Sequence, residues 1–377
     1  MANLTERDRY EWWVGDGADP IEGLASFLGH HGFPVSDLAV GAYSSEPGYG
    51  VGLLIGAAAS AVAVGAEPGA PSPCPDVPDV AAVVFDRRNE AQPAAVTLGA
   101  RYSALSLSEW RASWSDTDHA AAIRMVQAAI ASGEVYQVNV VGHRSAAYDG
   151  DPSAALRAVA GLSGAGYGGG LAGDGWAVLS ASPECLLTVA GGRATTRPIK
   201  GTRPSTAAGR VDLLDDAKER AEHVMIVDLE RNDLSRVAVP GTVAVEELFA
   251  VRRWAGLWQA ESVISARLRP GTGLVELLRA MLPGGSVTGA PKLAALRQIA
   301  ALEPVGRGPS MGAMGFLTRD RLDLGLTIRT VAVDHTRLHV WAGGGITWGS
   351  DPASEVAEAQ AKAGPVLAAL EGAARPL

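Results

Sequence analysis

Hydrophobic residues recur along the chain at two spacings, and each spacing predicts a different kind of element. Alternating or short continuous apolar runs, bounded by glycine and proline, predict strands. Apolar residues three and four positions apart predict helices. Strand-type segments lie at 81–86, 94–105, 135–147, 176–182, 185–190, 193–197 and 326–333. Helix-type segments lie at 117–132, 152–160, 218–237, after Pro291 and from Asp351 onward, and 51–65 fits a buried strand or helix.

The order of these segments predicts the fold class. Helices and strands mix without a strict strand–helix–strand period, and no internal repeat is visible. This order favours an α+β fold with large antiparallel sheets. Within helix 218–237, Asp228 falls in the apolar stripe. We expect Arg231 or Asn232 to pair with it, because a buried carboxylate needs a partner.

One hairpin organises the candidate chemistry. Segments 185–190 and 193–197 flank a Gly-Gly turn, with Glu184 at the entrance and Lys200 at the exit. Burial at a strand end would favour the neutral, nucleophilic form of a lysine. Glu184 and Lys200 are therefore the candidate catalytic residues. A surface hairpin with a solvated glutamate and lysine has the same pattern.

Two helix-type segments each carry a pair of glutamates three residues apart. Glu219 and Glu222 form one pair, and Glu355 and Glu358 form the other. Residues three apart share a helix face, so four carboxylates would meet if the two faces did. Such hard oxygen ligands suit Mg²⁺. Two solvated acidic faces are the alternative, because exposed glutamate is the norm.

Two single residues are candidates for anion binding. Thr288 lies in a glycine-rich turn before the helix that follows Pro291, and the amides at such a helix start can hold a carboxylate. Arg329 falls in the middle of an apolar strand, where it needs a carboxylate partner. A plain loop-to-helix junction and a structural ion pair are the respective alternatives.

A run of three glycines adds a further candidate anion site. Gly343, Gly344 and Gly345 lack side chains and would let a ligand reach the backbone amides. Lys362, one turn after Glu358, would add a cation at the same place.

Composition limits the classes of partner. The 377 residues carry a net charge of −9 without long charged runs. This disfavours nucleic acid and anionic membranes, since both need clustered lysine and arginine. The apolar run at 51–65 is too short to span a bilayer, and the N-terminus lacks the pattern of an export signal. Cys74 and Cys185 are far apart and indicate no disulfide framework, so we expect a cytoplasmic protein.

Seven motifs resemble one enzyme family. They are GEVYQVNV, SPE, RPIKGTRP, AEHVMIVDLERNDLSRV, PGGSVTGAPK, LTIRT and GGGITWGSDPASEVAEAQAKA. In this order they are similar to the chorismate-utilising enzymes. That family includes anthranilate synthase component I, aminodeoxychorismate synthase component I, and the isochorismate and salicylate synthases. The resemblance runs from about Gly133 to Leu367.

The resemblance implies a fold and a set of site residues. The fold would be of the anthranilate synthase component I type, with two packed antiparallel sheets enclosed by helices. Residues 1–95 would be a shortened N-terminal part of that fold, and 96–377 the chorismate-binding catalytic region. Mg²⁺ would be held by Glu222 and Glu358 directly, with Glu219 and Glu355 beside them. Chorismate would be met by Arg329, Thr288, Lys362, Gln137 and the amides of Gly343, Gly344 and Gly345.

Two positions indicate which branch of the family the chain resembles. Members that add water carry a lysine base where this chain has Gln137, and anthranilate synthases carry alanine in place of Lys200. The PIKGT sequence looks like that of aminodeoxychorismate synthase component I. This implies that Lys200 attacks carbon 2 of chorismate, with Glu184 protonating the leaving 4-hydroxyl. Ammonia would then enter at carbon 4 and give 4-amino-4-deoxychorismate, for folate or for a secondary metabolite.

The last expectations concern the source of ammonia and two positions that depart from the family pattern. Neither cysteine lies in a glutaminase nucleophile elbow, so the resemblance implies a separate glutaminase subunit. Gln259 stands where the family generally has histidine, and Ser310 replaces a tyrosine that lines the pocket. Amination at carbon 2, giving 2-amino-2-deoxyisochorismate or anthranilate, and a non-catalytic chorismate-binding paralogue are the alternatives.

Overall fold

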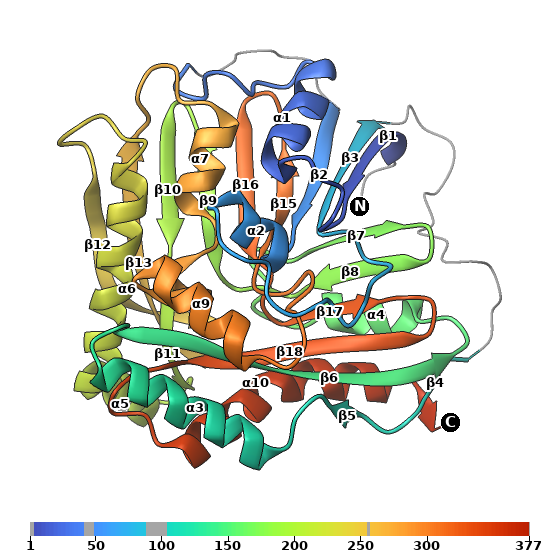
Figure 1. The fold of residues 1–377 in the computed structure, drawn as a ribbon, viewed down its shortest axis with the longest axis vertical. Coiled ribbons are helices and arrows are strands. Elements are labelled where there is room, and N and C mark those ends of the chain that lie inside the picture. The colour runs from blue at the N-terminus through green and yellow to red at the C-terminus, as the bar shows by residue number, and fades with distance from the viewer. Residues whose placement is uncertain (1–3, 41–48, 88–103, 255–256, 377) are drawn as a thin grey trace.

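Two β-sheets, whose long strands cross at a steep angle, form the centre of the protein (Figure 1). The computed structural model describes residues 4–40, 49–87, 104–254 and 257–376. Helices lie around the sheets. This architecture confirms the predicted α+β class with two packed antiparallel sheets.

The first sheet joins strands from both ends of the chain. Within the described residues it has ten strands in the order β1-β3-β2-β15-β16-β9-β10-β13-β11, with β12 also paired to β13. All of its strand pairs are antiparallel. The strands are β1 (Leu4–Trp12), β2 (Tyr49–Ile55), β3 (Val80–Arg87), β9 (Cys185–Ala190), β10 (Arg193–Arg197), β11 (Ile199–Pro204), β12 (Ala244–Trp254), β13 (Leu257–Arg267), β15 (Ala313–Leu317) and β16 (Arg321–Leu326).

The second sheet is built on one long central pair, β6 and β18. Its order is β19-β4-β6-β18-β17-β8-β7, and β5 and β14 also pair with β6. The short β19–β4 pair is parallel and the others are antiparallel. The strands are β4 (Ser106–Leu107), β5 (Arg111–Ala112), β6 (Gln137–Asp149), β7 (Gly169–Gly173), β8 (Trp176–Ser180), β14 (Gly289–Ala290), β17 (Thr330–Val333), β18 (Arg337–Ile346) and β19 (Arg375–Pro376).

Most of the predicted helices form at the predicted places. The helices are α1 (Pro20–His30), α2 (Ala57–Ala63), α3 (Asp116–Ala131), α4 (Ser153–Ala160), α5 (Ala207–Asp215), α6 (Ala217–Ser235), α7 (Leu274–Met281), α8 (Gly285–Thr288), α9 (Lys292–Leu302) and α10 (Pro352–Gly372). Asp351 caps α10, because its side chain accepts a hydrogen bond from the Ser354 amide. The 51–65 run contains the end of β2 and all of α2. Most of the predicted strand 94–105 falls outside the described residues.

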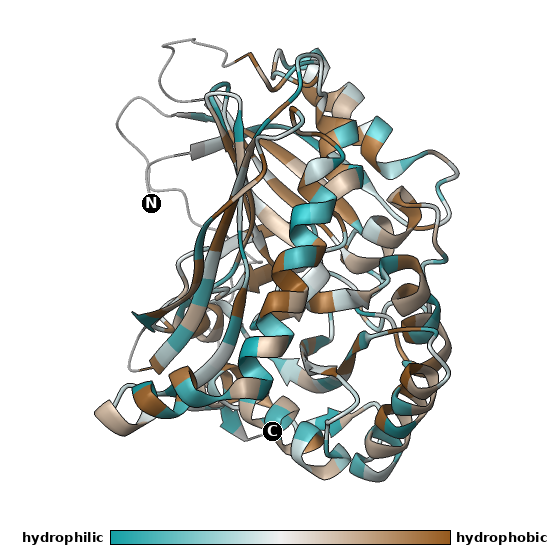
Figure 2. Ribbon diagram, turned by 90° about the vertical axis from the view of Figure 1, so that its left-hand side faces the viewer, coloured by the Kyte–Doolittle hydropathy of each residue, from teal (hydrophilic) through white to brown (hydrophobic). Residues whose placement is uncertain are grey.

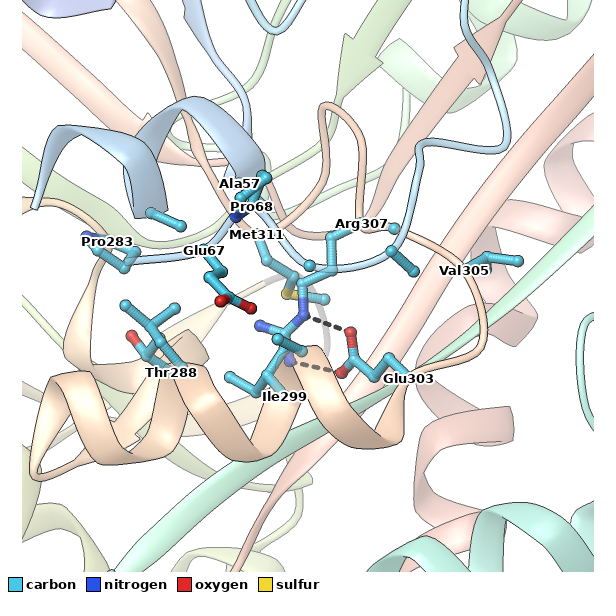
Figure 3. Close-up of a pocket in the computed structure, with 16 residues that line it drawn as sticks. Ala57, Glu67, Pro68, Pro283, Thr288, Ile299, Glu303, Val305, Arg307 and Met311 are labelled. Carbon is cyan, nitrogen blue, oxygen red and sulfur yellow. Dashed lines mark hydrogen bonds and ion pairs between the residues drawn. The ribbon is translucent and has the colours of Figure 1, made fainter. Parts of the chain in front are cut away.

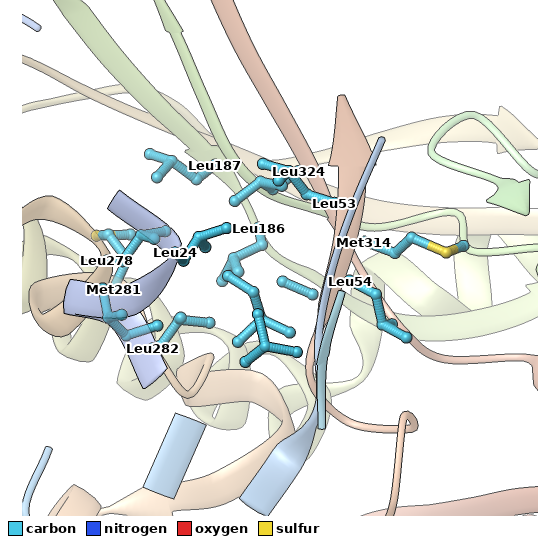
Figure 4. Packing of buried hydrophobic residues seen from close by; sticks show 14 of the residues in the cluster. Leu24, Leu53, Leu54, Leu186, Leu187, Leu278, Met281, Leu282, Met314 and Leu324 are labelled. Atoms are coloured by element: carbon cyan, nitrogen blue, oxygen red, sulfur yellow. The ribbon is translucent and has the colours of Figure 1, made fainter. Parts of the chain in front are cut away.

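The largest hydrophobic cluster lies between the first sheet and helices α1 and α7 (Figure 4). Leu53, Leu187 and Leu324 come from the sheet, while Leu24 and Leu278 come from the helices, and all five are at most 1% exposed. Full burial of such a side chain contributes about 1.5–3 kcal/mol. The cluster therefore fixes the first sheet against its helices. No helix within the described residues is both long enough and apolar enough to cross a membrane.

Helix α6 buries a different face from the predicted one. Asp228 is exposed and pairs with Arg231 at 2.8 Å, so its partner was predicted correctly but its burial was not. The buried face instead carries His223, Ile226, Val227, Glu230, Asp233 and Leu234. Figure 2 shows hydrophobic and hydrophilic residues following one another closely along the helices. The apolar stripe predicted the wrong buried face, because the inward face of α6 contains polar residues.

Candidate active site

The predicted hairpin is present and holds both candidate catalytic residues. Strands β9 and β10 pair antiparallel around the Gly-Gly turn, with Glu184 immediately before β9. Lys200 follows in β11, where it pairs with Ala260 of β13. The β11–β13 register shifts after Lys200, at Gly201, whose φ of 68° is easily adopted only by glycine. The shift in strand register therefore begins at the residue directly after Lys200.

Lys200 meets the second sheet at Gln137 and Gly345. A Cβ atom on Gly345 would lie 3.2 Å from Lys200 Nζ and 2.1 Å from Gln137 Nε2. Gln137 is fully buried, and neither its amide nitrogen nor its amide oxygen has a hydrogen-bond partner. Buried polar groups are nearly always satisfied. The unpaired amide therefore marks a place where a polar ligand would complete the hydrogen bonding.

Glu184 lies in the same interior region. It is 5% exposed, and its Oε1 atom has no hydrogen-bond partner. Burial raises the pKa of Glu184, and the neighbouring Ser286 hydroxyl and the Lys200 charge oppose this only in part. A carboxyl group with a raised pKa can hold a proton near neutral pH and donate it.

Arg329 reaches this region from a position that sequence reasoning placed wrongly. It does not sit in mid-strand but in the connection between β16 and β17, with a φ of 51°. Positive φ is uncommon for residues other than glycine and concentrates at functional sites. Burial lowers the pKa of the half-buried Arg329, and the charge of Glu184 opposes that shift. The predicted carboxylate neighbour is thus Glu184.

The predicted glycine run lies beside Lys362 and Glu355. Lys362 Nζ donates to the Gly343 carbonyl at 3.1 Å. A Cβ atom on Gly344 would lie 3.2 Å from Glu355 Oε2 and 3.7 Å from Lys362 Nζ. The structure therefore brings the glycine run and Lys362 together at one end of β18, as the sequence predicted, and it adds Lys200 beside Gly345.

The four predicted metal ligands come from α6 and α10 and are held by cationic side chains. Glu222 and Glu355 each lie 3.7 Å from Lys218 Nζ. Glu358 pairs with Lys362 at 2.7 Å, and Glu219 lies 3.5 Å from Arg203. Within the described part of the chain, no three acidic, histidine or cysteine side chains are gathered closely enough to hold a metal.

The carboxylates nevertheless have the donor chemistry that Mg²⁺ prefers. Burial raises the pKa of Glu222, opposed by the charges of Lys200 and Lys218. The pKa of Glu358 is lowered, because Lys362, Lys200 and Lys218 outweigh its burial. Carboxylates from both helices therefore lie within electrostatic reach of the same two lysines, Lys200 and Lys218. Lys218 Nζ, at 3.7 Å from both Glu222 and Glu355, links the carboxylates of the two helices.

Thr288 is hydrogen-bonded within its own short helix, α8. Its hydroxyl donates to the Gly284 carbonyl, and it lines a pocket with Glu303 and Arg307 (Figure 3). None of the other predicted site residues lines that pocket. Arg307 forms a buried ion pair with Glu303 at 2.6 Å and donates to the Asn139 carbonyl of β6 at 2.8 Å. This pair fixes the second sheet against the end of α9, close to Gln137.

The two unusual residues are both buried. Gln259, in β13, is 2% exposed and its Oε1 atom has no hydrogen-bond partner. Ser310 is fully buried, and its hydroxyl donates to the Thr327 carbonyl at 3.2 Å. Gln259 therefore offers a second unpaired amide oxygen on the strand that carries the partner of Lys200.

Sequence reasoning missed His223, which lies next to Glu222. Its Nε2 atom is 2.5 Å from Ser262 Oγ, and its Nδ1 atom has no partner. Burial, together with the charge of Lys200, lowers the pKa of His223 to about 4. It is a neutral polar group within electrostatic reach of Lys200. Hydrophobic spacing gave no signal for it, because the buried face of α6 mixes polar residues such as His223 and Glu230 with Ile226.

The two cysteines of the chain are structural. Both are free and buried, and burial raises the pKa of each thiol to about 12. Such thiols stay protonated and unreactive at neutral pH.

Together, the fold and the site define an α+β protein in which two antiparallel sheets bring a lysine, a buried glutamic acid and an arginine into one interior region. A family model described as chorismate binding enzyme matches residues 86–368. The chain therefore belongs to the chorismate binding enzyme family.

Curated relatives carry two different names. Aminodeoxychorismate synthase component 1 of Klebsiella aerogenes is 40% identical over 271 residues, covering 70% of this chain and 60% of that protein. Anthranilate synthase component 1 of Streptomyces coelicolor is 38% identical over 272 residues, covering 70% and 53%. The matched region thus spans between half and two thirds of each of these relatives.

A solved structure shows the same fold. Anthranilate synthase component I from Streptococcus pneumoniae TIGR4 superposes with a TM-score of 0.81 at 24% identity, covering 97% of this chain and 91% of that one.

Proposed function

We propose that this protein aminates chorismate at carbon 4 with ammonia and forms 4-amino-4-deoxychorismate. The observation that carries the proposal is the position of Lys200, whose Nζ atom lies beside Gly345 and Gln137 and within electrostatic reach of Glu184. An amine nucleophile beside a carboxyl group of raised pKa suits the displacement of a poor leaving group. Relatives named aminodeoxychorismate synthase component 1 support the same choice.

The proposed reaction has two displacement steps. In the first, the amine of Lys200 forms a bond to carbon 2, the two conjugated double bonds of the ring both shift by one position, and the bond from carbon 4 to oxygen breaks. Glu184 gives its proton to the departing hydroxyl, which leaves as water. In the second, ammonia forms a bond to carbon 4, both double bonds shift back, and the bond from carbon 2 to Lys200 breaks. The new ammonium group then returns a proton to Glu184.

Other side chains would hold the substrate and the metal. Arg329, Lys362 and the amides at Gly343–Gly345 would bind the two carboxylates of chorismate, and Gln137 would hydrogen-bond to the ring substituents. Glu222 and Glu358, with Glu219 and Glu355 beside them, would hold Mg²⁺. When bound, Mg²⁺ would neutralise a substrate carboxylate and orient the ring.

Ammonia would come from a separate glutaminase subunit. The two buried thiols of this chain are unsuited to glutamine hydrolysis. The component 1 names of the relatives support a second component. High concentrations of ammonium salt would replace that subunit in a purified assay.

The test is incubation with chorismate, Mg²⁺ and ammonium at mildly alkaline pH, with products separated by chromatography and identified by mass fragmentation. We expect a 4-amino product that keeps its enolpyruvyl group. Lys200→Ala should form none of it, and Lys200→Arg should also fail, because it keeps the charge without the nucleophile. Without ammonium, wild-type protein should gain the mass of chorismate less water at Lys200.

Relatives named anthranilate synthase favour a second candidate, amination at carbon 2. That reaction would give anthranilate or 2-amino-2-deoxyisochorismate, which is isomeric with the carbon 4 product but fragments differently. Either compound as the product would replace the proposed function by this one. Unchanged chorismate, with tight chorismate binding, would indicate a binding protein.

A further inference from the structure

Glu230 is a buried carboxyl group that the proposed reaction does not use. It lies on α6 and is only 3% exposed, on the inward face rather than with Glu219 and Glu222. Thr196 Oγ1, on β10, donates a hydrogen bond to Glu230 Oε2 at 2.6 Å. An ionised carboxylate at such a position is costly unless a cation pairs with it.

The hairpin connects Glu230 to Glu184 on one side. Thr196, which holds Glu230, directly precedes Arg197 in β10. Arg197 pairs with Cys185 across the β9–β10 ladder, and Cys185 directly follows Glu184. Thr196, which bonds to Glu230, is therefore next to Arg197, and Arg197 lies opposite the residue that follows Glu184.

Helix α8 connects the same two groups on the other side. A Cβ atom on Gly285 would lie 3.8 Å from Glu230 Cγ. The next residue, Ser286, lies beside the Glu184 carboxyl group. The two carboxyl groups thus share one buried region, bounded by the hairpin and by α8.

The charged groups that face Glu230 do not neutralise it. Burial is the main cause that raises its pKa to about 8, and the charges of Glu184 and Asp233 add to burial. The Thr196 hydrogen bond and Lys292 oppose the shift, but Lys292 forms a 2.8 Å ion pair with Asp233. The nearby Cys185 thiol is buried, and burial raises its pKa to about 12. Burial without a cation of its own therefore favours the protonated form of Glu230.

We propose that Glu230 is a positioning residue that acts through Glu184, and that its proton allows Glu184 to alternate between acid and carboxylate during turnover. The proposal rests on the proposed function. Two carboxylates in a shared region of low dielectric cannot both ionise at low cost. While Glu230 is neutral, Glu184 can release its proton to the leaving hydroxyl. Once Glu230 ionises, its charge opposes that release.

The first experiment is the pH dependence of chorismate consumption, measured regardless of product. We expect the wild-type kcat/KM to fall by about threefold or more between pH 7 and 9 as Glu230 ionises. Glu230→Gln, which is always neutral and keeps a hydrogen-bonding group for Thr196, should keep the rate at pH 7 and lose this part of the decline. Asp228→Asn changes an exposed carboxylate of the same helix and should keep the wild-type profile.

Two kinetic results would overturn the proposal. One is a Glu230→Gln profile that coincides with the wild-type profile. The other is a rate lowered equally at every pH, which would indicate a structural role. Thermal unfolding of each variant, measured beside the kinetics, reports whether the fold is intact.

A second measurement needs no turnover, so it separates this proposal from the proposed function. In protein labelled with ¹³C at glutamate carboxyl carbons, the resonance missing from Glu230→Gln should titrate near pH 8. In Glu184→Gln, the same resonance should titrate at lower pH, because the opposing charge is gone. A Glu230 resonance that titrates in the ordinary glutamate range, or one unaffected by Glu184→Gln, would refute the coupling even if chorismate is aminated as proposed.

Discussion

Gly345 of the second sheet lies directly beside the candidate nucleophile of the first sheet. Gly345→Ala would place a methyl group 2.1 Å from Gln137 Nε2 and 3.2 Å from Lys200 Nζ. Because Gln137 is fully buried, its amide cannot move away without disturbing its neighbours. We expect turnover to fall by about tenfold or more, as expected when groups are misplaced by about 1 Å, and kinetics with ammonium would measure it.

A matched control for this prediction lies in the turn that follows β18. A Cβ atom on Gly349 would meet nothing within 4 Å, so Gly349→Ala should keep wild-type activity. Gln137→Ala, combined with Gly345→Ala, should make room for the methyl group and relieve the crowding of Lys200. Full activity in the single Gly345→Ala variant would contradict the proposed contact.

Individual residues were predictable where local pattern decides their position. The positions of Glu184 and Lys200 were predictable because the hairpin turn defines where β9 begins and where β10 ends. Arg329 was placed in a strand because its neighbours are apolar, but its positive φ ends the strand there. His223 and Glu230 were missed, because a polar residue on a buried face cannot be recognised from hydrophobic spacing alone.

Helices α6 and α10 supply the carboxylates proposed to hold Mg²⁺. Glu222→Gln and Glu358→Gln should each remove a charge from this site and raise the Mg²⁺ concentration needed for half-maximal turnover by about tenfold or more, as loss of one charged ligand weakens a hard-cation site. A chelator such as EDTA should stop turnover of the wild type. Magnesium titration of the ammonium-dependent rate measures both effects.

The control for the metal prediction is on α10 itself. Glu371 lies exposed in the last turn of that helix, so Glu371→Gln should leave the magnesium dependence unchanged. Thermal unfolding with and without Mg²⁺ gives a second readout, because a ligand that binds only the folded state stabilises it. Equal magnesium requirements in all variants would place the metal elsewhere.

Whole elements were predicted more reliably than the faces they bury. The predicted helices 117–132 and 218–237 match α3 and α6 within one or two residues at each end, because caps and helical periodicity are local signals. The buried side of α6 was wrong, since it depends on what the helix packs against. Propensity and spacing describe one element at a time, whereas packing involves two.

At the scale of the whole molecule, acid should destabilise the fold through its buried histidines. Burial, with smaller effects of His339 and Arg337, lowers the pKa of His143 to about 3. An unfolded histidine titrates near 6.5, so below that pH the unfolded chain binds a proton that the folded chain does not. Stability is therefore lost as pH falls from about 6.5 toward 3. Between pH 7 and 5, His143 alone should cost about 2 kcal/mol.

Urea unfolding at pH 7 and pH 5 measures this loss. His143→Gln removes the titrating group and should show a loss smaller by about 2 kcal/mol, although it weakens the contacts to Ser113 and His339 at both pH values. The exposed His335 serves as control, because His335→Gln should lose as much stability as the wild type. Equal losses in all three proteins would mean that His143 does not titrate on unfolding.

The overall architecture was predicted only in part from the pattern of the residues. Mixed strands and helices indicated an α+β fold, but the order of strands in each sheet depends on pairings between distant segments. β2 pairs with β15, and β6 pairs with β18. No local signal specifies such a partner. The resemblance to the chorismate-utilising family supplied the two-sheet arrangement that the residue pattern left open.

The pairing of β6 with β18 also has a consequence for synthesis of the chain. Val138 of β6 pairs with Ile346 of β18, so the ribosome completes β6 long before its main partner exists. Until then, the long β6 has unpaired amides and carbonyls along that edge, which is a hazard for aggregation. Pairings between such distant segments also slow folding. The contact between Lys200 of the first sheet and Gly345 of β18 therefore forms only after β18 has been made.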